Sequence, residues 1–230
     1  MLDSDERELF RTAMIAVVRF QLALAVLLFL PAWSLRFWQA WLFLVLFSGF
    51  VMFSTLYFLR RDPALVRRRL NVGPAAEPER SQKIIQAIAG VLLVAVFLVP
   101  GFDHRWQWSS VPTSLVWGGN AAMLAGWLFV VRVLQENSFA ASTVQVEPAQ
   151  RVVATGPYAW VRHPMYAGSV LAFLATPLAL GSWWALLPAL LLCGSMVVRL
   201  LDEERYLTVH LPGYDAYRAA LRWRLVPGVW

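Results

Sequence analysis

Six apolar stretches fill most of this 230-residue chain and constrain its fold. The first four cover residues 12–33, 39–59, 84–100 and 114–134. Apolar runs of about eighteen residues or more are typical of helices that cross a lipid bilayer. Only 15% of the residues are charged, well below the share expected of a soluble domain. The sequence therefore predicts an all-α integral membrane protein and disfavours a soluble helical bundle.

The last two apolar stretches cover residues 166–180 and 183–200. A Gly-Ser pair separates them, so we interpret them as a tight helical hairpin that enters the membrane and returns. The predicted architecture is four transmembrane helices, this C-terminal membrane hairpin and a polar C-terminal tail that starts at Asp202. We expect a single membrane domain, in which residues 1–134 form a four-helix scaffold and residues 135–230 form the cofactor-binding catalytic half.

The charged residues predict how the chain is oriented in the membrane. The formal net charge is +6, and seven basic residues lie in the polar stretch over residues 60–83. Basic loops stay on the cytoplasmic side of a membrane. We therefore expect this loop, the N-terminus and the C-terminus to be cytoplasmic in a multi-pass protein, with a bacterial inner membrane as the expected location. Arginines clustered in loops are explained by this orientation, so nucleic acid is not an expected partner.

Two further features of the apolar stretches have simple interpretations. Cys193 is the single cysteine, which excludes an intramolecular disulfide and argues against a cysteine-based metal cluster, so no metal site is predicted. Gly118, Ala122 and Gly126 recur every four residues and predict a face that permits close helix packing. The pattern leaves open whether this face packs within the chain or against a second copy, so it does not predict an oligomeric state.

One polar stretch, residues 155–168, interrupts the apolar pattern directly before the hairpin. It reads TGPYAWVRHPMYAG and places the Arg162-His163 pair between two prolines and two tyrosines. A helical hairpin begins and ends at the same face of the membrane. This pair, which precedes the hairpin, is therefore predicted to meet Glu203 and Glu204, which follow it, as half of a cofactor site. A proline that starts a helix and a solvated helix end explain the same residues more simply. The spacing alone leaves both interpretations open.

Two signatures in the second half of the chain resemble those of the isoprenylcysteine carboxyl methyltransferase family, to which the phospholipid N-methyltransferases are related. The first reads GPYAWVRHPMYAG, over residues 156–168. The second combines a pair of glutamates with spaced residues further on, namely Glu203, Glu204, Leu211, Gly213, Tyr214, Tyr217 and Pro227. The resemblance covers roughly residues 120–228, and the two signatures stand in the expected order.

The resemblance implies an integral membrane methyltransferase that uses S-adenosyl-L-methionine and acts on a lipophilic acceptor, a carboxylate such as isoprenylcysteine. The expected partners are membrane lipids and a lipophilic or prenylated substrate that enters from the bilayer between helices. Matching by position, the residues expected to bind the cofactor are Tyr158, His163, Pro164, Tyr166, Gly168, Glu203 and Glu204.

Arg162, His163 and Glu204 are the catalytic residues expected from the same resemblance. Arg162 would hold a carboxylate of the cofactor or substrate. His163 would orient the cofactor, or act as a base if the acceptor is an amine. Glu204, or Glu203, would accept hydrogen bonds from the ammonium group or ribose hydroxyls of the cofactor.

Three alternatives remain at this point. The first is an N- or O-methyltransferase of phospholipids or other small amphiphiles, because the signatures do not specify the acceptor. The second is a sterol-reductase-like enzyme that uses NADPH, although such proteins are usually longer. The third is a non-enzymatic membrane protein such as a transporter, although transporters commonly place polar residues at mid-membrane and this chain gathers its charge at one face.

Overall fold

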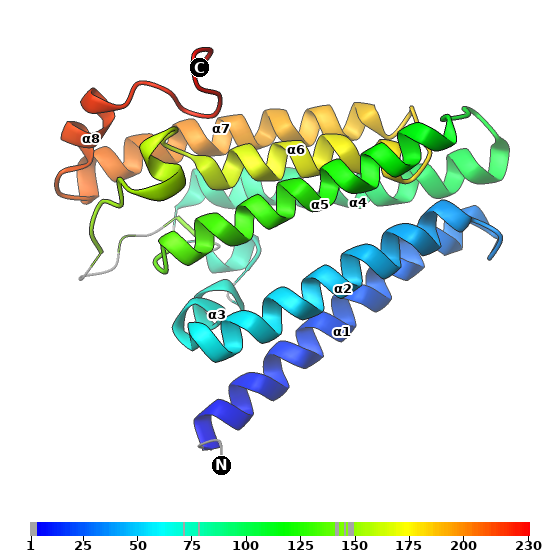
Figure 1. The fold of residues 1–230 in the computed structure, drawn as a ribbon, viewed down its shortest axis with the longest axis horizontal. Coiled ribbons are helices and arrows are strands. Elements are labelled where there is room, and N and C mark those ends of the chain that lie inside the picture. The colour runs from blue at the N-terminus through cyan, green and yellow to red at the C-terminus, as the bar shows by residue number, and fades with distance from the viewer. Residues whose placement is uncertain (1–3, 71, 78, 141–142, 145, 147–149) are drawn as a thin grey trace.

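The computed structural model describes residues 4–70, 72–77, 79–140, 143–144, 146 and 150–230. Within these residues the protein is helical and has no strand, as predicted. In chain order the helices are α1 (Ser4–Ala32), α2 (Trp38–Arg61), α3 (Pro63–Leu70), η1 (Pro74–Ala76), α4 (Arg80–Trp106), α5 (Thr113–Glu136), η2 (Gly156–Ala159), α6 (Pro164–Ala179), α7 (Leu186–His210) and α8 (Tyr214–Ala220). The helices α1, α2, α4, α5, α6 and α7 form one elongated bundle (Figure 1).

Four of the described helices, α1, α2, α4 and α5, are long and apolar enough to cross a membrane. They confirm the four long spans predicted from the sequence, and each helix extends beyond its apolar stretch. Their outward faces carry apolar side chains, as at Val45 and Val91, which are 68% and 71% exposed. Lipid solvates such surfaces, so these exposed side chains agree with a membrane location.

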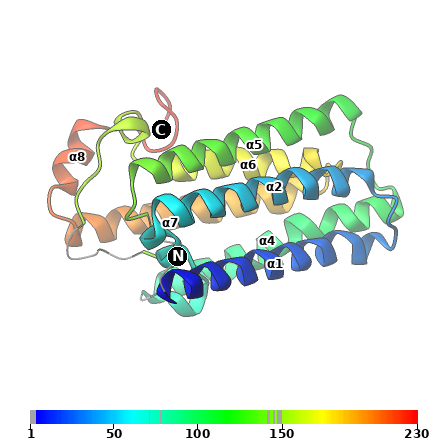
Figure 2. The ribbon, with the colours of Figure 1, turned by 60° about the horizontal axis from the view of Figure 1, so that its bottom comes forward.

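The helices α6 and α7 pack against each other and are joined by a short turn over residues 180–185 (Figures 1 and 2). The helix α6 has 16 residues and is too short to count as a span by length, so insertion of this pair into the bilayer stays a prediction. The helix α7 does not end near residue 200, as the sequence suggested, but continues to His210. The polar tail was therefore predicted to start too early, because Asp202, Glu203 and Glu204 lie inside a helix. The start of α1 and the helix α8 lie at the same end of the bundle (Figure 1).

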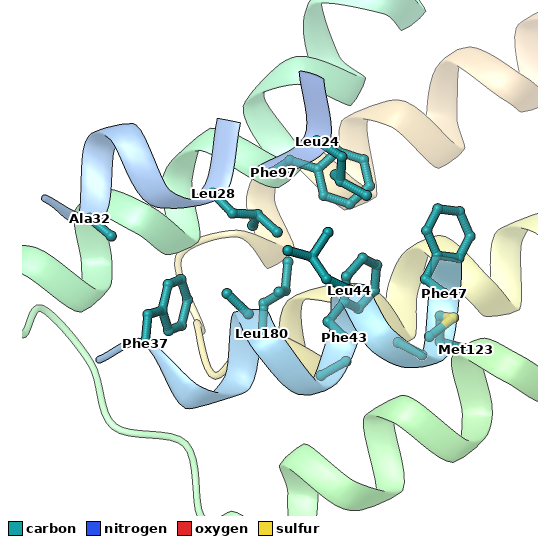
Figure 3. Packing of buried hydrophobic residues seen from close by; sticks show 13 residues of the cluster. Leu24, Leu28, Ala32, Phe37, Phe43, Leu44, Phe47, Phe97, Met123 and Leu180 are labelled. Atoms are coloured by element: carbon teal, nitrogen blue, oxygen red, sulfur yellow. The ribbon is translucent and has the colours of Figure 1, made fainter. Parts of the chain in front are cut away.

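A buried aromatic cluster holds the scaffold together (Figure 3). Phe37, Phe43 and Phe47 come from α2 and the residue before it, and Phe97 comes from α4. Leu180 adds the turn between α6 and α7 to the same cluster. The packing of large aromatic side chains therefore fixes the hairpin turn against the scaffold.

The helix α5 packs closely along α6, and glycines make this approach feasible. A Cβ atom added to Gly126 would lie 2.6 Å from the carbonyl oxygen of Gly168, and one added to Gly119 would lie 2.5 Å from the amide nitrogen of Ala179. The small-residue face predicted on α5 packs against α6 at Gly126, but within this chain Gly118 makes no such contact, because its Cβ would meet nothing within 4 Å. Gly119 and Gly126 are seven residues apart. This spacing places both glycines on the same face of α5, which packs against the nearly antiparallel helix α6.

Gly126→Ala should lower the free energy of unfolding by about 1–3 kcal/mol, because the added methyl group meets backbone atoms that cannot rotate away. Gly118→Ala is the matched control on the same helix, and its methyl group faces open space. Thermal unfolding in detergent measures both. Equal unfolding temperatures for the two variants would show that α5 and α6 do not approach this closely.

Candidate active site

The polar segment before α6 is fixed to the end of α5. Gly156 has a φ of 56°, in the left-handed region, and an added Cβ would lie 2.7 Å from the Glu136 carboxylate, so glycine is favoured there. The Thr155 hydroxyl donates a hydrogen bond of 2.6 Å to Glu136. Pro164 then occupies the first turn of α6, which confirms its predicted role as a helix start.

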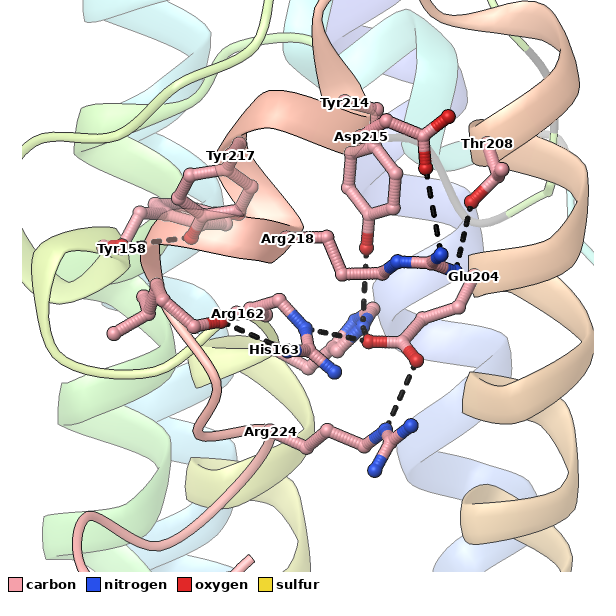
Figure 4. A network of polar contacts seen from close by, with 11 residues as sticks. Tyr158, Arg162, His163, Glu204, Thr208, Tyr214, Asp215, Tyr217, Arg218 and Arg224 are labelled. Atoms are coloured by element: carbon pink, nitrogen blue, oxygen red, sulfur yellow. Dashed lines mark hydrogen bonds and ion pairs between the residues drawn. The ribbon is translucent and has the colours of Figure 1, made fainter.

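The return of α7 brings Glu204 to the Arg162-His163 pair (Figure 4). The Arg162 Nε group donates to Glu204 Oε1 over 2.7 Å, and His163 Nε2 lies 3.1 Å from the same oxygen. All three residues are buried, with 4–5% of their surface exposed. Because a carboxylate only accepts hydrogen bonds, Nε2 carries the hydrogen, and Nδ1 is the basic nitrogen of the neutral ring. The predicted meeting of these residues is confirmed by their geometry.

A third basic residue that the sequence did not single out completes this cluster. Arg224 Nε lies 2.9 Å from Glu204 Oε2. The segment after α8 also runs along the motif, because the backbone N–H groups of Arg162 and His163 donate to the carbonyl oxygens of Trp223 and Arg224 over 2.9 and 3.0 Å. The sequence showed Arg224 as one of several arginines in the tail, and that pattern does not reveal which of them turns inward.

Glu204 stays ionised in this setting. Burial alone would raise the pKa of its carboxyl group, but hydrogen bonds from His163, Arg162 and Arg224 outweigh burial and lower the pKa to about 2. The same contacts occupy both carboxylate oxygens, and Glu204 does not line the neighbouring pocket. Its geometry is therefore that of a group that positions Arg162 and His163.

A pocket lies beside this cluster, between the segment before α6, the end of α7 and α8. Its enclosed volume is about 100 Å³, and its mouth is open. Most of the predicted site residues line it, namely Tyr158, Arg162, His163, Pro164, Tyr166 and Glu203. Gly168 does not line it and lies in the contact between α5 and α6. Six of the eight predicted site residues therefore line the pocket, and Gly168 and Glu204 lie outside its lining.

Three tyrosines close one side of the pocket. The Tyr217 hydroxyl donates to the backbone carbonyl oxygen of Tyr158 over 2.7 Å, and the Tyr158 hydroxyl accepts a hydrogen bond of 3.1 Å from Asn137. Burial raises the pKa of Tyr158 to about 12 and also raises the pKa values of Tyr214 and Tyr217. All three are therefore neutral at physiological pH and act as hydrogen-bonding aromatic walls.

An apolar groove of about 310 Å³ lies on the other side of the same wall, among α4, α5, α6 and α7. The apolar residues that line it include Ala89, Leu93, Trp127, Phe173, Leu192 and Met196. Tyr166 and Glu203 line both cavities, and the Tyr166 hydroxyl donates to Glu203 Oε2 over 2.6 Å. Two basic residues, Arg69 and Arg199, also line the groove. The polar pocket and the apolar groove thus meet at Tyr166 and Glu203.

No group of three or more histidine, cysteine, aspartate or glutamate residues lies in a metal-binding arrangement within the part of the chain that the structure describes. The titratable side chains that line the pocket are those of Glu203, two arginines, His163 and four tyrosines.

The stability of the protein should depend on pH through Glu204. Its folded pKa lies below its ordinary value, so its contribution is fully present above about pH 4.5 and is lost as the pH falls toward 2. Glu204→Gln should cost about 3 kcal/mol at pH 7, because it leaves the buried basic groups without their anion. The cost should shrink toward pH 3.

Thermal unfolding in detergent across this pH range is the measurement. Glu8→Gln, at an exposed position on α1, is the control for the loss of a carboxylate. A constant difference between Glu204→Gln and the wild type at all pH values would contradict the low pKa.

The comparison with known proteins bears on the same half of the chain. Residues 114–211 match a family model described as phospholipid methyltransferase. No curated protein sequence matches the chain. The matched residues extend from α5 to the end of α7 and include Arg162, His163, Glu203 and Glu204. This family is related to the isoprenylcysteine carboxyl methyltransferases, so the resemblance drawn from the two signatures is confirmed. Residues 114–211 are therefore similar to the phospholipid methyltransferase family.

Proposed function

We propose that the protein is an S-adenosyl-L-methionine-dependent methyltransferase of the membrane that acts on a lipophilic acceptor, with a carboxylate such as isoprenylcysteine as the first candidate. One observation carries the proposal. A polar pocket and an apolar groove share a wall at Tyr166 and Glu203, within the segment that matches a methyltransferase family. A methyltransferase that transfers a methyl group from a polar donor to an apolar acceptor needs two adjoining cavities, one polar and one apolar.

The groups around the pocket fit this cofactor chemically. S-adenosyl-L-methionine supplies a methyl group that is already activated by a sulfonium centre, so the reaction requires no metal. Glu203 would accept hydrogen bonds from the ammonium group or the ribose hydroxyls. Tyr158, His163, Pro164 and Tyr166 would form the remaining contacts in the pocket and its open mouth.

Arg162 and Glu204 would act mainly by fixing His163. The carboxylate holds both basic residues, and Arg162 Nη1 also donates to the carbonyl oxygen of Leu221 over 2.8 Å. A carboxylate acceptor loses no proton on methylation, so the residues need only orient it and exclude water. An amine acceptor must lose a proton, and His163 is the base that lines the pocket.

The groove would hold the apolar part of the acceptor. Its lining is aliphatic and aromatic, and it lies among helices of the bundle. The guanidinium groups of Arg69 and Arg199 favour an acceptor with an anionic group, since arginine binds carboxylates and phosphates with paired hydrogen bonds. This lining fits a carboxylate acceptor and a phospholipid alike. A phospholipid is the second candidate, because the matching family model carries that description.

Purified protein in detergent should bind S-adenosyl-L-methionine, and Glu203→Gln should weaken binding by about ten-fold or more through loss of a charged acceptor. Isothermal titration calorimetry measures both dissociation constants. Asp215→Asn removes an exposed carboxylate at 3.5 Å from Arg218 and is the matched control. The absence of heat from the wild type would contradict a methyltransferase and favour a non-enzymatic membrane protein.

The acceptor is identified by transfer of a labelled methyl group to separate pools of prenylcysteines, phospholipids and isoprenoids. Label in the prenylcysteine pool supports the first candidate, and label in the phospholipid pool supports the second. Binding of reduced nicotinamide cofactor, without binding of S-adenosyl-L-methionine, would favour a reductase.

Ala89→Trp should block the groove and lower methyl transfer to a long-chain acceptor by about ten-fold, comparable to the loss of 1–2 kcal/mol of binding. Cofactor affinity should not change, because Ala89 does not line the polar pocket. Ile88→Trp introduces the same side chain at the neighbouring position on the exposed face of α4, where Ile88 is 51% exposed, and should retain activity. Equal activity of the two variants would exclude the groove as the acceptor site.

A further inference from the structure

Glu77 is a buried carboxylate in the connection between α3 and α4, outside the segment that matches the family model. It is 2% exposed. Its Oε1 atom accepts hydrogen bonds from Arg199 Nη2 over 2.7 Å and from Gln86 Nε2 over 3.1 Å. Its Oε2 atom accepts a hydrogen bond of 3.0 Å from the backbone N–H of Val144. A carboxylate that is this deeply buried requires such partners.

Every described partner of Glu77 lines one of the two cavities. Gln86 and Arg199 line the apolar groove, and Val144 lies in the wall that the groove shares with the polar pocket. Arg199 Nε also donates to the Tyr166 hydroxyl over 3.2 Å, and that hydroxyl donates to Glu203. One continuous series of hydrogen bonds therefore runs from Glu77 through Arg199 and Tyr166 to Glu203.

The charges along this series of hydrogen bonds explain how Glu77, at one end, affects the position of Glu203, at the other. Arg199 and Glu203 are four residues apart on α7 and lie on the same face of the helix, so they are near enough to attract each other. In the structure Arg199 is paired with Glu77, and Glu203 accepts the Tyr166 hydroxyl. Without the negative charge of Glu77, Arg199 would have Glu203 as its nearest remaining carboxylate. Glu203 would then turn away from the pocket.

We propose that Glu77 is a positioning residue of the methyl-transfer site. It holds Arg199 and the Val144 backbone, and through Arg199 it fixes the Tyr166 hydroxyl and the Glu203 carboxylate where the pocket and the groove meet. The connection between α3 and α4 thereby helps to position Tyr166, Arg199 and Glu203, which come from α6 and α7. The inference rests on the proposed function, because it assigns Glu203 to the donor and the groove to the acceptor.

The test is a cycle of Glu77→Gln, Tyr166→Phe and the double variant in the full-length protein in detergent. The measurements are kcat for methyl transfer, the calorimetric dissociation constant of S-adenosyl-L-methionine, and the thermal unfolding temperature. Glu79→Gln is the matched control, because Glu79 is exposed and lies two residues away in the same connection. It should leave all three quantities unchanged.

We expect Glu77→Gln to lower kcat and cofactor affinity by about ten-fold in the wild-type background, as for loss of a hydrogen bond to a charged group. In the Tyr166→Phe background the same change should lower kcat and cofactor affinity by less than about two-fold, because the series of hydrogen bonds to Glu203 is already interrupted at Tyr166. Its effect on the unfolding temperature should be similar in both backgrounds. A merely structural role predicts the same loss of kcat in both.

Arg199→Lys provides a second route if Glu77→Gln cannot be purified in folded form. Lysine keeps the charge that pairs with Glu77 but cannot donate to Glu77 and Tyr166 in the same fixed geometry. We expect folded protein with about ten-fold lower kcat. Wild-type kcat in either folded variant, or equal losses in both backgrounds, would overturn the positioning role alone. A wild-type protein that binds no S-adenosyl-L-methionine would overturn the proposed function and this inference with it.

Discussion

The site depends on one buried carboxylate surrounded by basic groups. Glu204 on α7 receives Arg162 and His163 from the segment before α6 and Arg224 from the segment after α8. A charge removed from water is costly unless other groups replace the lost hydration. Each of these three segments therefore depends on the other two for its position. The Arg-His motif and the acidic motif are consequently two parts of a single electrostatic cluster, and the pocket forms along its edge.

The sequence was sufficient to predict that these parts meet. Apolar stretches of membrane length, separated by a short Gly-Ser pair, predict a helical hairpin whose two ends lie at the same side of the membrane. This places Arg162 beside Glu204, which is 42 positions later in the sequence. Helix ends were predicted less well. The apolar pattern stops near residue 200, whereas α7 continues to His210. Its last turns carry charged residues whose partners come from distant segments, and a hydropathy pattern contains no information about such pairing.

The residues that the sequence did not reveal are those whose importance arises from distant partners. Glu77 and Arg199 are 122 positions apart, and Arg224 lies in a tail with several arginines. Arg199 did carry a signal, because a basic residue at the end of a predicted membrane stretch requires an explanation. The contact between α5 and α6 includes Gly119 rather than Gly118 for a related reason. Several small residues occupy that helix, and only the position of α6 determines which of them make the contact.

Three consecutive acidic residues on α7 have three different environments. Asp202 accepts hydrogen bonds from Ser81 and Gln82 at the start of α4, and Glu204 holds the Arg-His motif. Successive helical residues point about 100° apart, so neighbours in sequence necessarily face different elements. Glu203 is the member that faces both cavities, and its described partner is a neutral hydroxyl group. Glu203 therefore faces the site proposed for the donor, whereas both oxygens of Glu204 are held by basic side chains. The division of roles between Glu203 and Glu204 thus follows from helix geometry together with the location of the basic groups.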